Sequence, residues 1–227
     1  MTDIYPAETL SGTVTSFIPL TTTFTPSAGC SDFFRLNGPS LVAFDPGYGL
    51  DIDTNVRCLP SAVTTWWEQG RFGDASDGAH TAVSIGPLTC PDKWPTVASS
   101  VKDSSSTLVM CCPPDYHLEN GIPGSVIGDC LSDVPSGATI RFASTSPDNS
   151  ESWSTATTDL ASDSSVGAIA VVGWNIHRTS YITSSTPTTT SHPTSPTTTL
   201  ASITSSNPTA SSIRAQQLVL ESGLALP

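Results

Sequence analysis

Charged residues are scarce in this chain, and basic residues are the scarcest. Only 12% of its 227 residues are charged, and 8 Lys and Arg stand against 20 Asp and Glu, which gives a formal charge of −12. A nucleic-acid-binding protein needs a basic face that neutralises phosphates. The composition therefore excludes nucleic acid as an expected partner, and it fits a protein kept in solution by its acidic surface or working outside the cell.

Long apolar runs are also missing. No stretch reaches 18 consecutive apolar residues, so we expect no transmembrane segment in this chain. Residues 1–20 have neither a basic start nor an uninterrupted apolar stretch, so they are not expected to be a signal peptide. The final stretch, SIRAQQLVLESGLALP, is too weakly apolar for a lipid-anchor signal.

Several chemical motifs are absent as well. The chain has no CxxC knuckle, no G-x-S-x-G elbow and no N-x-[ST] sequon. These absences count against a structural zinc site and a hydrolase elbow, and they leave O-linked sugars as the expected form of glycosylation. We therefore predict no enzyme activity, no catalytic residue, no cofactor and no metal.

Serine and threonine take the place of the missing apolar and charged residues, and they divide the chain. Residues 183–199 read TSSTPTTTSHPTSPTTT, which has almost nothing to bury. Such a run does not fold alone, and its composition is typical of an O-glycosylated stalk, with an unmodified linker as the alternative. We expect a polar, disordered lead-in over 1–19, a Cys-rich β domain over 20–181 and a disordered Ser/Thr/Pro tail over 182–227.

Six cysteines are present, and all lie within the expected domain. An even number in a modest domain that is rich in turn residues predicts disulfide bonds, although six cysteines allow 15 pairings. A metal site and a free or reactive thiol are the alternatives. The six are Cys30, Cys58, Cys90, Cys111, Cys112 and Cys130.

Cys111 and Cys112 are adjacent in the stretch LVMCCPPDYHL. Neighbouring side chains on a strand point to opposite faces. The pair is therefore predicted to form two disulfides in different directions. Asp115 and Glu119, which lie nearby, argue against a low-pKa catalytic thiol.

Short runs of β-branched and aromatic residues recur between Gly, Pro, Asp and Ser, and no window keeps an apolar period of 3.6 residues. This pattern predicts a mainly β, loop-rich domain in which disulfides compensate for a thin core. The expected strands are LTTTFT (20–25), SLVAF (40–44), AVTTWW (62–67), HTAVSI (80–85), TLVMCC (107–112), ATIRFA (138–143) and GAIAVVGW (167–174).

Several of these stretches resemble a family of uncharacterised Cys-rich ectodomains from filamentous fungi. The resemblance covers about residues 20–181 and rests on TTTFTPSAGC (21–30), IGPLTCPDKWPTV (85–97), LVMCCPPDYHL (108–118) and AIAVVGWNIHRTS (168–180). It implies a secreted, membrane-associated or cell-surface location and a Ser/Thr-rich stalk after the domain. It implies no particular activity.

Candidate ligand-binding residues are few. Asp51 and Asp53, with Asp45 and Asn55, resemble the start of a calcium loop, but Val56 stands where an EF-hand requires Gly, so a looser calcium site or a solvated acidic turn is left. Trp66 and Trp67 are adjacent, so one ring of a strand would face outward and could stack on a sugar. Packing under a loop is the alternative for this ring.

Catalytic constellations are weaker still. Asp74 and Asp77, with Glu68, could act as paired carboxylates of a glycoside hydrolase, although acidic residues are ordinary in Gly-rich turns. A general base could come from His80, His117 or His177, but no nucleophile is marked beside them.

The sequence as a whole predicts a non-enzymatic extracellular or cell-wall-associated protein with a structural or interaction role. Cell-wall polysaccharide and surface proteins are the expected partners. The alternatives are a secreted carbohydrate- or small-ligand-binding module, a secreted hydrolase, and an intracellular protein with reduced thiols.

Overall fold

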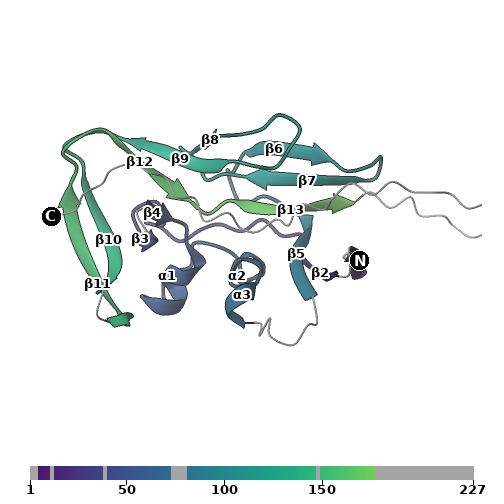
Figure 1. Cartoon of the computed structure of the whole chain (residues 1–227), viewed down its shortest axis with the longest axis horizontal. Helices are drawn as coiled ribbons and strands as arrows, with labels where there is room; N and C mark the ends of the chain where they lie inside the picture. Colours follow the sequence, from purple (N-terminus) through teal and green to yellow (C-terminus); the bar gives the residue numbers. More distant parts are fainter. Residues whose placement is uncertain (1–4, 11–12, 38–39, 73–80, 147–148, 177–227) are drawn as a thin grey trace, which may run out of the picture. The chain divides into compact units, whose positions relative to one another are not determined.

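Thirteen strands and three short helices make up the part of the chain that the computed structural model describes, which is residues 5–10, 13–37, 40–72, 81–146 and 149–176. The strands form three sheets (Figure 1). The mainly β fold expected from the sequence is confirmed. The tail expected over 182–227 lies outside the described residues.

The largest sheet has seven strands in the order β11-β10-β3-β4-β12-β9-β8. Two of its pairings, β3 with β10 and β4 with β12, are parallel, and the other four are antiparallel. Its strands are β3 (Phe34–Asn37), β4 (Ser40–Ala43), β8 (His117–Glu119), β9 (Asp129–Val134), β10 (Thr139–Ser146), β11 (Asn149–Asp159) and β12 (Ser164–Ala168).

A second sheet, in the order β1-β2-β5, begins the fold and corrects the prediction for the lead-in. β1 (Glu8–Leu10) and β2 (Thr13–Leu20) lie where disorder was expected, and β2 pairs in parallel with β5 (Thr81–Leu88). The strand expected over 20–25 is absent, because β2 ends at Leu20. The Thr-rich start is therefore ordered by a partner that lies far along the chain.

The third sheet, in the order β13-β7-β6, contains Cys111 at the end of β7, and Cys112 follows directly. It consists of β6 (Thr96–Val101), β7 (Ser106–Cys111) and β13 (Val171–Ile176), all antiparallel. The single strand expected over 167–174 is two strands, β12 and β13, separated by Ile169 and Ala170.

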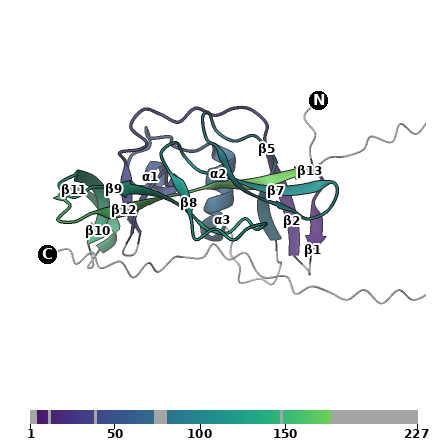
Figure 2. The same cartoon turned by 90° about the horizontal axis from the view of Figure 1, so that it is seen from above.

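Three short helices follow one another between β4 and β5: α1 (Pro46–Asp51), α2 (Ser61–Trp67) and α3 (Gln69–Phe72). In both Figure 1 and Figure 2, α2 lies between α1 and β5. The prediction of a strand over 62–67 is wrong, because these residues lie in α2. The Pro60 carbonyl accepts from the backbone of Val63 and Thr64, which starts a helical turn.

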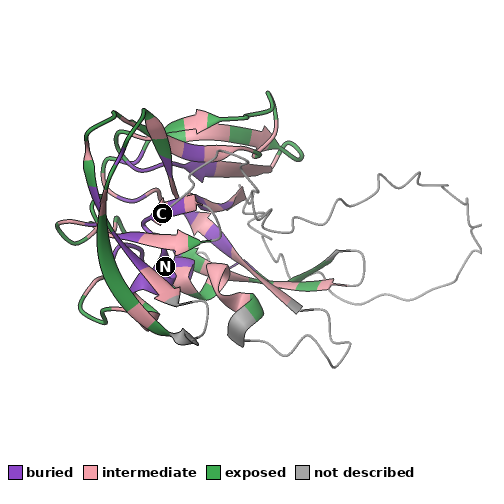
Figure 3. Cartoon of the chain, turned by 60° about the vertical axis from the view of Figure 1, so that its left-hand side comes forward, coloured by how far each residue is buried: buried purple, intermediate pink, exposed green. Residues whose placement is uncertain are grey.

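The buried residues form two clusters, and the three sheets share the larger one. This cluster gathers side chains such as Phe34, Val63, Ile85 and Val171, and it includes Cys111. The smaller cluster joins Met110, Cys112 and Cys130 to partly buried side chains of β6, β8 and β13. Figure 3 shows the buried segments in purple inside a largely exposed rim. A thin core of this kind gains much from covalent crosslinks.

The two ends of the described domain meet. The Ile176 backbone N–H donates to the Tyr5 hydroxyl at 2.8 Å, and that hydroxyl donates to the Ile176 carbonyl at 3.2 Å. Tyr5 is buried, and its ring packs edge-on against Phe17 of β2. The last strand is thereby fixed to the start of the chain.

Candidate functional site

Three disulfides join all six cysteines and form the most distinctive feature of the domain. They link Cys30 to Cys58, Cys90 to Cys111 and Cys112 to Cys130, with Cα–Cα separations of 5.4, 6.0 and 5.6 Å. No cysteine is free. The disulfide prediction is therefore confirmed, and the pairing that the sequence left open is assigned.

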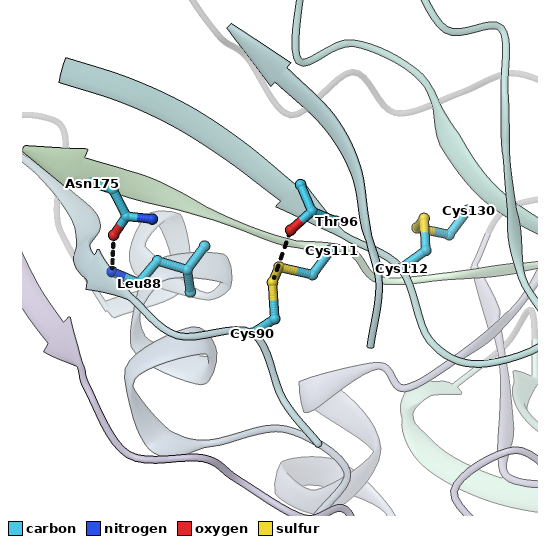
Figure 4. The surroundings of a disulfide bond; sticks show 7 residues. All are labelled: Leu88, Cys90, Thr96, Cys111, Cys112, Cys130 and Asn175. Carbon is cyan, nitrogen blue, oxygen red and sulfur yellow. Dashed lines mark hydrogen bonds between the residues drawn. A yellow bond between two sulfur atoms is a disulfide. The ribbon is translucent and has the colours of Figure 1, made fainter. Parts of the chain in front are cut away.

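Cys111 and Cys112 do act in two directions, as the strand geometry predicts. Cys111 ends β7, pairs in register with Val171, and belongs to the larger core cluster. Cys112 belongs to the smaller cluster, together with its partner Cys130 on β9. Figure 4 shows the two bonds leaving the same stretch of chain in different directions. Cys111 therefore links β7 to the segment after β5, and Cys112 links the residue after β7 to the large sheet.

Hydrogen bonds hold the segment around Cys90 in place (Figure 4). The Cys90 Sγ lies 3.5 Å from the Thr96 hydroxyl, and the Leu88 N–H donates to Asn175 Oδ1 at 3.1 Å. Cys90 itself is partly exposed, whereas Cys111 is fully buried. The connection from β5 to β6 is thus fixed at a side chain of β13 and at the disulfide.

Arg35 organises a second cluster of polar side chains. Its guanidinium donates to the Asp45 carboxylate at 3.3 and 3.4 Å and to Asp51 Oδ2 at 3.2 Å. The same group lies 4.5 Å from the ring centre of Trp153 on β11. Arg35 therefore ties α1 to the large sheet, and its planar fork suits both carboxylates and an aromatic face.

Asp45 is the acidic partner at the centre of this cluster. Its side chain is 1% exposed, and its Oδ1 accepts from the Gly47 N–H at 2.7 Å, which caps the start of α1. Burial raises the pKa of the Asp45 carboxyl, although Arg35 and the Gly47 N–H both act to lower this pKa. The desolvation of the carboxylate therefore outweighs its ion pair.

This raised pKa predicts the sign of a pH effect. A carboxyl whose folded pKa lies above its unfolded value stabilises the fold fully below that value, 3.8, and this contribution is lost as pH rises through the folded pKa. We expect the free energy of unfolding of the wild type to fall relative to that of Asp45→Asn as pH rises above 3.8 and through the folded pKa of Asp45. Urea unfolding over this range measures the difference.

Asp103 is the matched control for this pH effect. Hydrogen bonds from Ser105 and Ser106 lower the pKa of its exposed carboxyl, so its contribution is present above 3.8 and lost as pH falls through the folded pKa. The wild type should therefore gain relative to Asp103→Asn as pH rises. Two variants with slopes of the same sign would contradict this account.

The predicted acidic candidates do not converge. Asp51 is partly buried and accepts from Arg35, whereas Asp53 is exposed and accepts from the backbone and side-chain amides of Asn55. Within the part of the chain that the structure describes, no group of three or more His, Cys, Asp or Glu side chains could hold a metal ion. In this stretch Asp53 closes a turn at Asn55, and Asp45 and Asp51 form ion pairs with Arg35.

Trp66 and Trp67 lie on a helix rather than a strand. Their ring centres are 5.9 Å apart with the planes tilted by 56°, and both rings are partly buried against the larger core cluster. The prediction that one of the two rings would face outward from a strand is therefore wrong.

The structure describes only two of the other catalytic candidates, Glu68 and His117. Asp74, Asp77, His80 and His177 lie outside the described residues. Glu68 follows α2, and its N–H donates to the Thr64 carbonyl. His117 lies at the edge of the large sheet, with its Nε2 3.7 Å from Glu119. Glu68 and His117 thus belong to different elements, after α2 and in β8.

Comparison with known proteins adds no relative to this picture. No family model, curated protein or solved structure matches the chain. The likeness to fungal ectodomains thus rests on the motifs alone and stays a prediction. The described residues contain no helix long and apolar enough to cross a membrane.

Sequence reasoning missed Arg35. A single Arg inside the apolar stretch FFRLN was a usable signal, since a charge in a strand facing a buried region needs a partner. The stretch from Asp45 to Asp53 resembles the start of a calcium loop in sequence, but in the structure Asp45 and Asp51 pair with an arginine.

Proposed function

We propose that this chain is a non-enzymatic extracellular or cell-surface protein with a structural or interaction role, presented on its Ser/Thr-rich tail. The observation that carries the proposal is that all six cysteines are paired, with Cys111 and Cys112 in two different clusters. Such disulfides form and persist in oxidising compartments.

The disulfides and the composition support the same location. A core divided into two clusters is expected to depend on crosslinks, as is common in small secreted domains. The acidic surface and the Ser/Thr/Pro run of residues 183–199 suit an exposed protein on an O-glycosylated stalk. The motif resemblance to fungal ectodomains agrees with this role.

The proposal predicts a specific covalent state. Protein from a filamentous fungal host should contain no free thiol, should gain six thiols on reduction, and should carry hexose additions confined to peptides from residues 183–199. Intact mass and peptide mapping with thiol alkylation, before and after reduction, measure all three. Six free thiols and an unmodified tail would instead indicate an intracellular protein.

Cell-wall polysaccharide is the partner that we propose to test first. Wild type and Trp66→Ala should be compared for retention by insoluble glucan and chitin, with Trp94→Phe as a control for a buried ring away from α2. Retention that depends on Trp66 would favour a carbohydrate-binding role. Equal release of all three proteins would leave surface proteins as the proposed partners.

A further inference from the structure

Strand β11 forms one edge of the large sheet, and it is long, with its only charges, Glu151 and Asp159, outside its central seven residues. It has 11 residues, and its only sheet neighbour among the described residues is β10. From Ser152 to Thr158 it reads SWSTATT, without a charge, a Pro or a Gly. Figure 3 shows it as a ribbon that is mostly exposed. An edge of this kind is a template for another strand.

The other edges of the described sheets are β1, β5, β6, β8 and β13. β5 and β13 pack against each other, with Gly173 close to the Ile85 carbonyl, and the remaining three are protected in recognised ways. β1 and β8 have three residues each, and β8 carries His117 and Glu119. β6 is interrupted by a register shift next to Thr96 and is followed by Lys102. Natural sheets use short strands, charges and bulges to block edge pairing. β11 keeps seven consecutive pairs with β10 without a register shift, from Trp153 to Asp159, and its only charge over this range is Asp159, at the end.

The edge strand β11 is also ordered by contacts within its own chain. β10 pairs with β11 in one continuous register from Thr139–Asp159 to Thr145–Trp153. The guanidinium of Arg35 covers the Trp153 ring at 4.5 Å and is itself fixed by Asp45 and Asp51. A strand that is already ordered loses little conformational entropy on pairing.

We propose that this edge binds a second copy of the chain, with β11 pairing antiparallel to β11 across a two-fold axis. A twofold pairing uses the same surface on both copies, so the assembly closes at two. The exposed threonines, Thr155 and Thr157, suit a paired strand. The inference stands independently of the proposed location and role.

Regular pairing and charge together select the register, because the part of β11 that pairs with β10 without a shift, Trp153–Asp159, is centred on Ala156. With Ala156 on the axis, Asp159 faces Trp153 of the other copy and Thr155 faces Thr157. Moving the axis by one residue to Thr155 would set Asp159 opposite Glu151, and like charges in direct opposition are unfavourable. The structure therefore favours the axis at Ala156.

The pairing should be weak and favoured by salt. It adds main-chain hydrogen bonds rather than a large apolar area, so it lies below the size of a stable interface. Two chains that each carry −12 also repel one another at low ionic strength. We expect the monomer–dimer equilibrium to shift toward dimer as salt rises, opposite to an association driven by surface ion pairs.

Sedimentation equilibrium of the oxidised full chain, over a range of concentrations and salt, tests the proposal. Wild type should form a dimer. Ala156→Lys should weaken it by roughly tenfold or more, since two ammonium groups would meet at the axis. Ser99→Lys, at an exposed position of β6, is the matched control and should dimerise as the wild type does.

A charge swap distinguishes a broken interface from a damaged fold. Ala156→Asp alone should also be mainly monomeric, but an equal mixture of Ala156→Asp and Ala156→Lys should recover dimer, because opposite charges then meet on the axis. Hydrogen exchange of the wild type should show amide protection over 153–158 that grows with concentration. A monomer at all concentrations, whether its β11 amides are exposed or already protected by another segment of the chain, would overturn the proposal.

Discussion

Reduction of the three disulfides is expected to unfold the domain at ordinary temperature. The bonds span 28, 21 and 18 residues, and a loop of this size stabilises a fold by about 3 kcal/mol. Their combined contribution, about 10 kcal/mol, is comparable to the whole stability of a typical domain, 5–15 kcal/mol. The measurement is urea unfolding, followed by far-ultraviolet circular dichroism, with and without a reducing agent.

Pairwise variants separate the three contributions. Cys112→Ala with Cys130→Ala removes only the bond in the smaller cluster, and Cys30→Ala with Cys58→Ala removes the one before α2. Because the loop lengths are similar, each pair should lose a similar amount of stability, about 3 kcal/mol. An unchanged unfolding midpoint after complete reduction, verified by thiol counting, would contradict the central place given to these bonds.

Arg35→Met is expected to destabilise the fold by about 3 kcal/mol near neutral pH, because it leaves the carboxylate of Asp45 buried without its counter-ion. Met keeps most of the aliphatic stem, so the lost stability reports mainly the charge. Loss of Arg35 also removes an influence that lowers the pKa of Asp45, so this pKa rises further. The destabilisation should therefore shrink as pH falls through the folded pKa of Asp45, because protonation removes the buried charge.

Two controls make the Arg35 result interpretable. Arg57→Met removes an exposed arginine and should change stability by less than about 0.5 kcal/mol. The double variant Arg35→Met with Asp45→Asn should be more stable at neutral pH than Arg35→Met alone, since no buried charge is left. A cost for Arg35→Met that is independent of pH would show that packing, rather than charge, explains it.

The sequence predicts those strands whose own residues are apolar and buried. SLVAF, HTAVSI, TLVMCC and ATIRFA correspond to β4, β5, β7 and β10. β11 was missed because its Ser, Thr and acidic residues are typical of a turn, and only its pairing with β10 makes it a strand. β2 was missed for a related reason: its partner residues in β5 lie 67 or 68 positions later in the chain, as in the pair Val14 and Thr81.

Helix α2 shows local preference overridden by packing. Val, Thr and Trp favour strands, and seven residues are too few to reveal a helical period. The helix forms because Pro60 provides its first carbonyl acceptors and because Ala62 and Val63 fill the core at 8% and 0% exposure. Because the element is a helix rather than a strand, the rings of Trp66 and Trp67 also point in directions other than those predicted.

The site could be predicted only where the covalent pattern was decisive. The opposite bridging of Cys111 and Cys112 follows from the alternation of a strand, which needs no knowledge of the fold. The pairing of Asp45 with Arg35 depends on β3, β4 and α1 meeting in space, and no spacing in the sequence encodes this contact.

The contact between Tyr5 and Ile176 has a consequence for how such a domain can be built into larger proteins. Because the chain enters and leaves the described fold at one point, the domain needs a single place of attachment. It could be inserted into a surface loop of a host protein without stretching that loop, or its ends could be joined and new ends opened elsewhere. The order of its strands along the gene is therefore separable from their order in space.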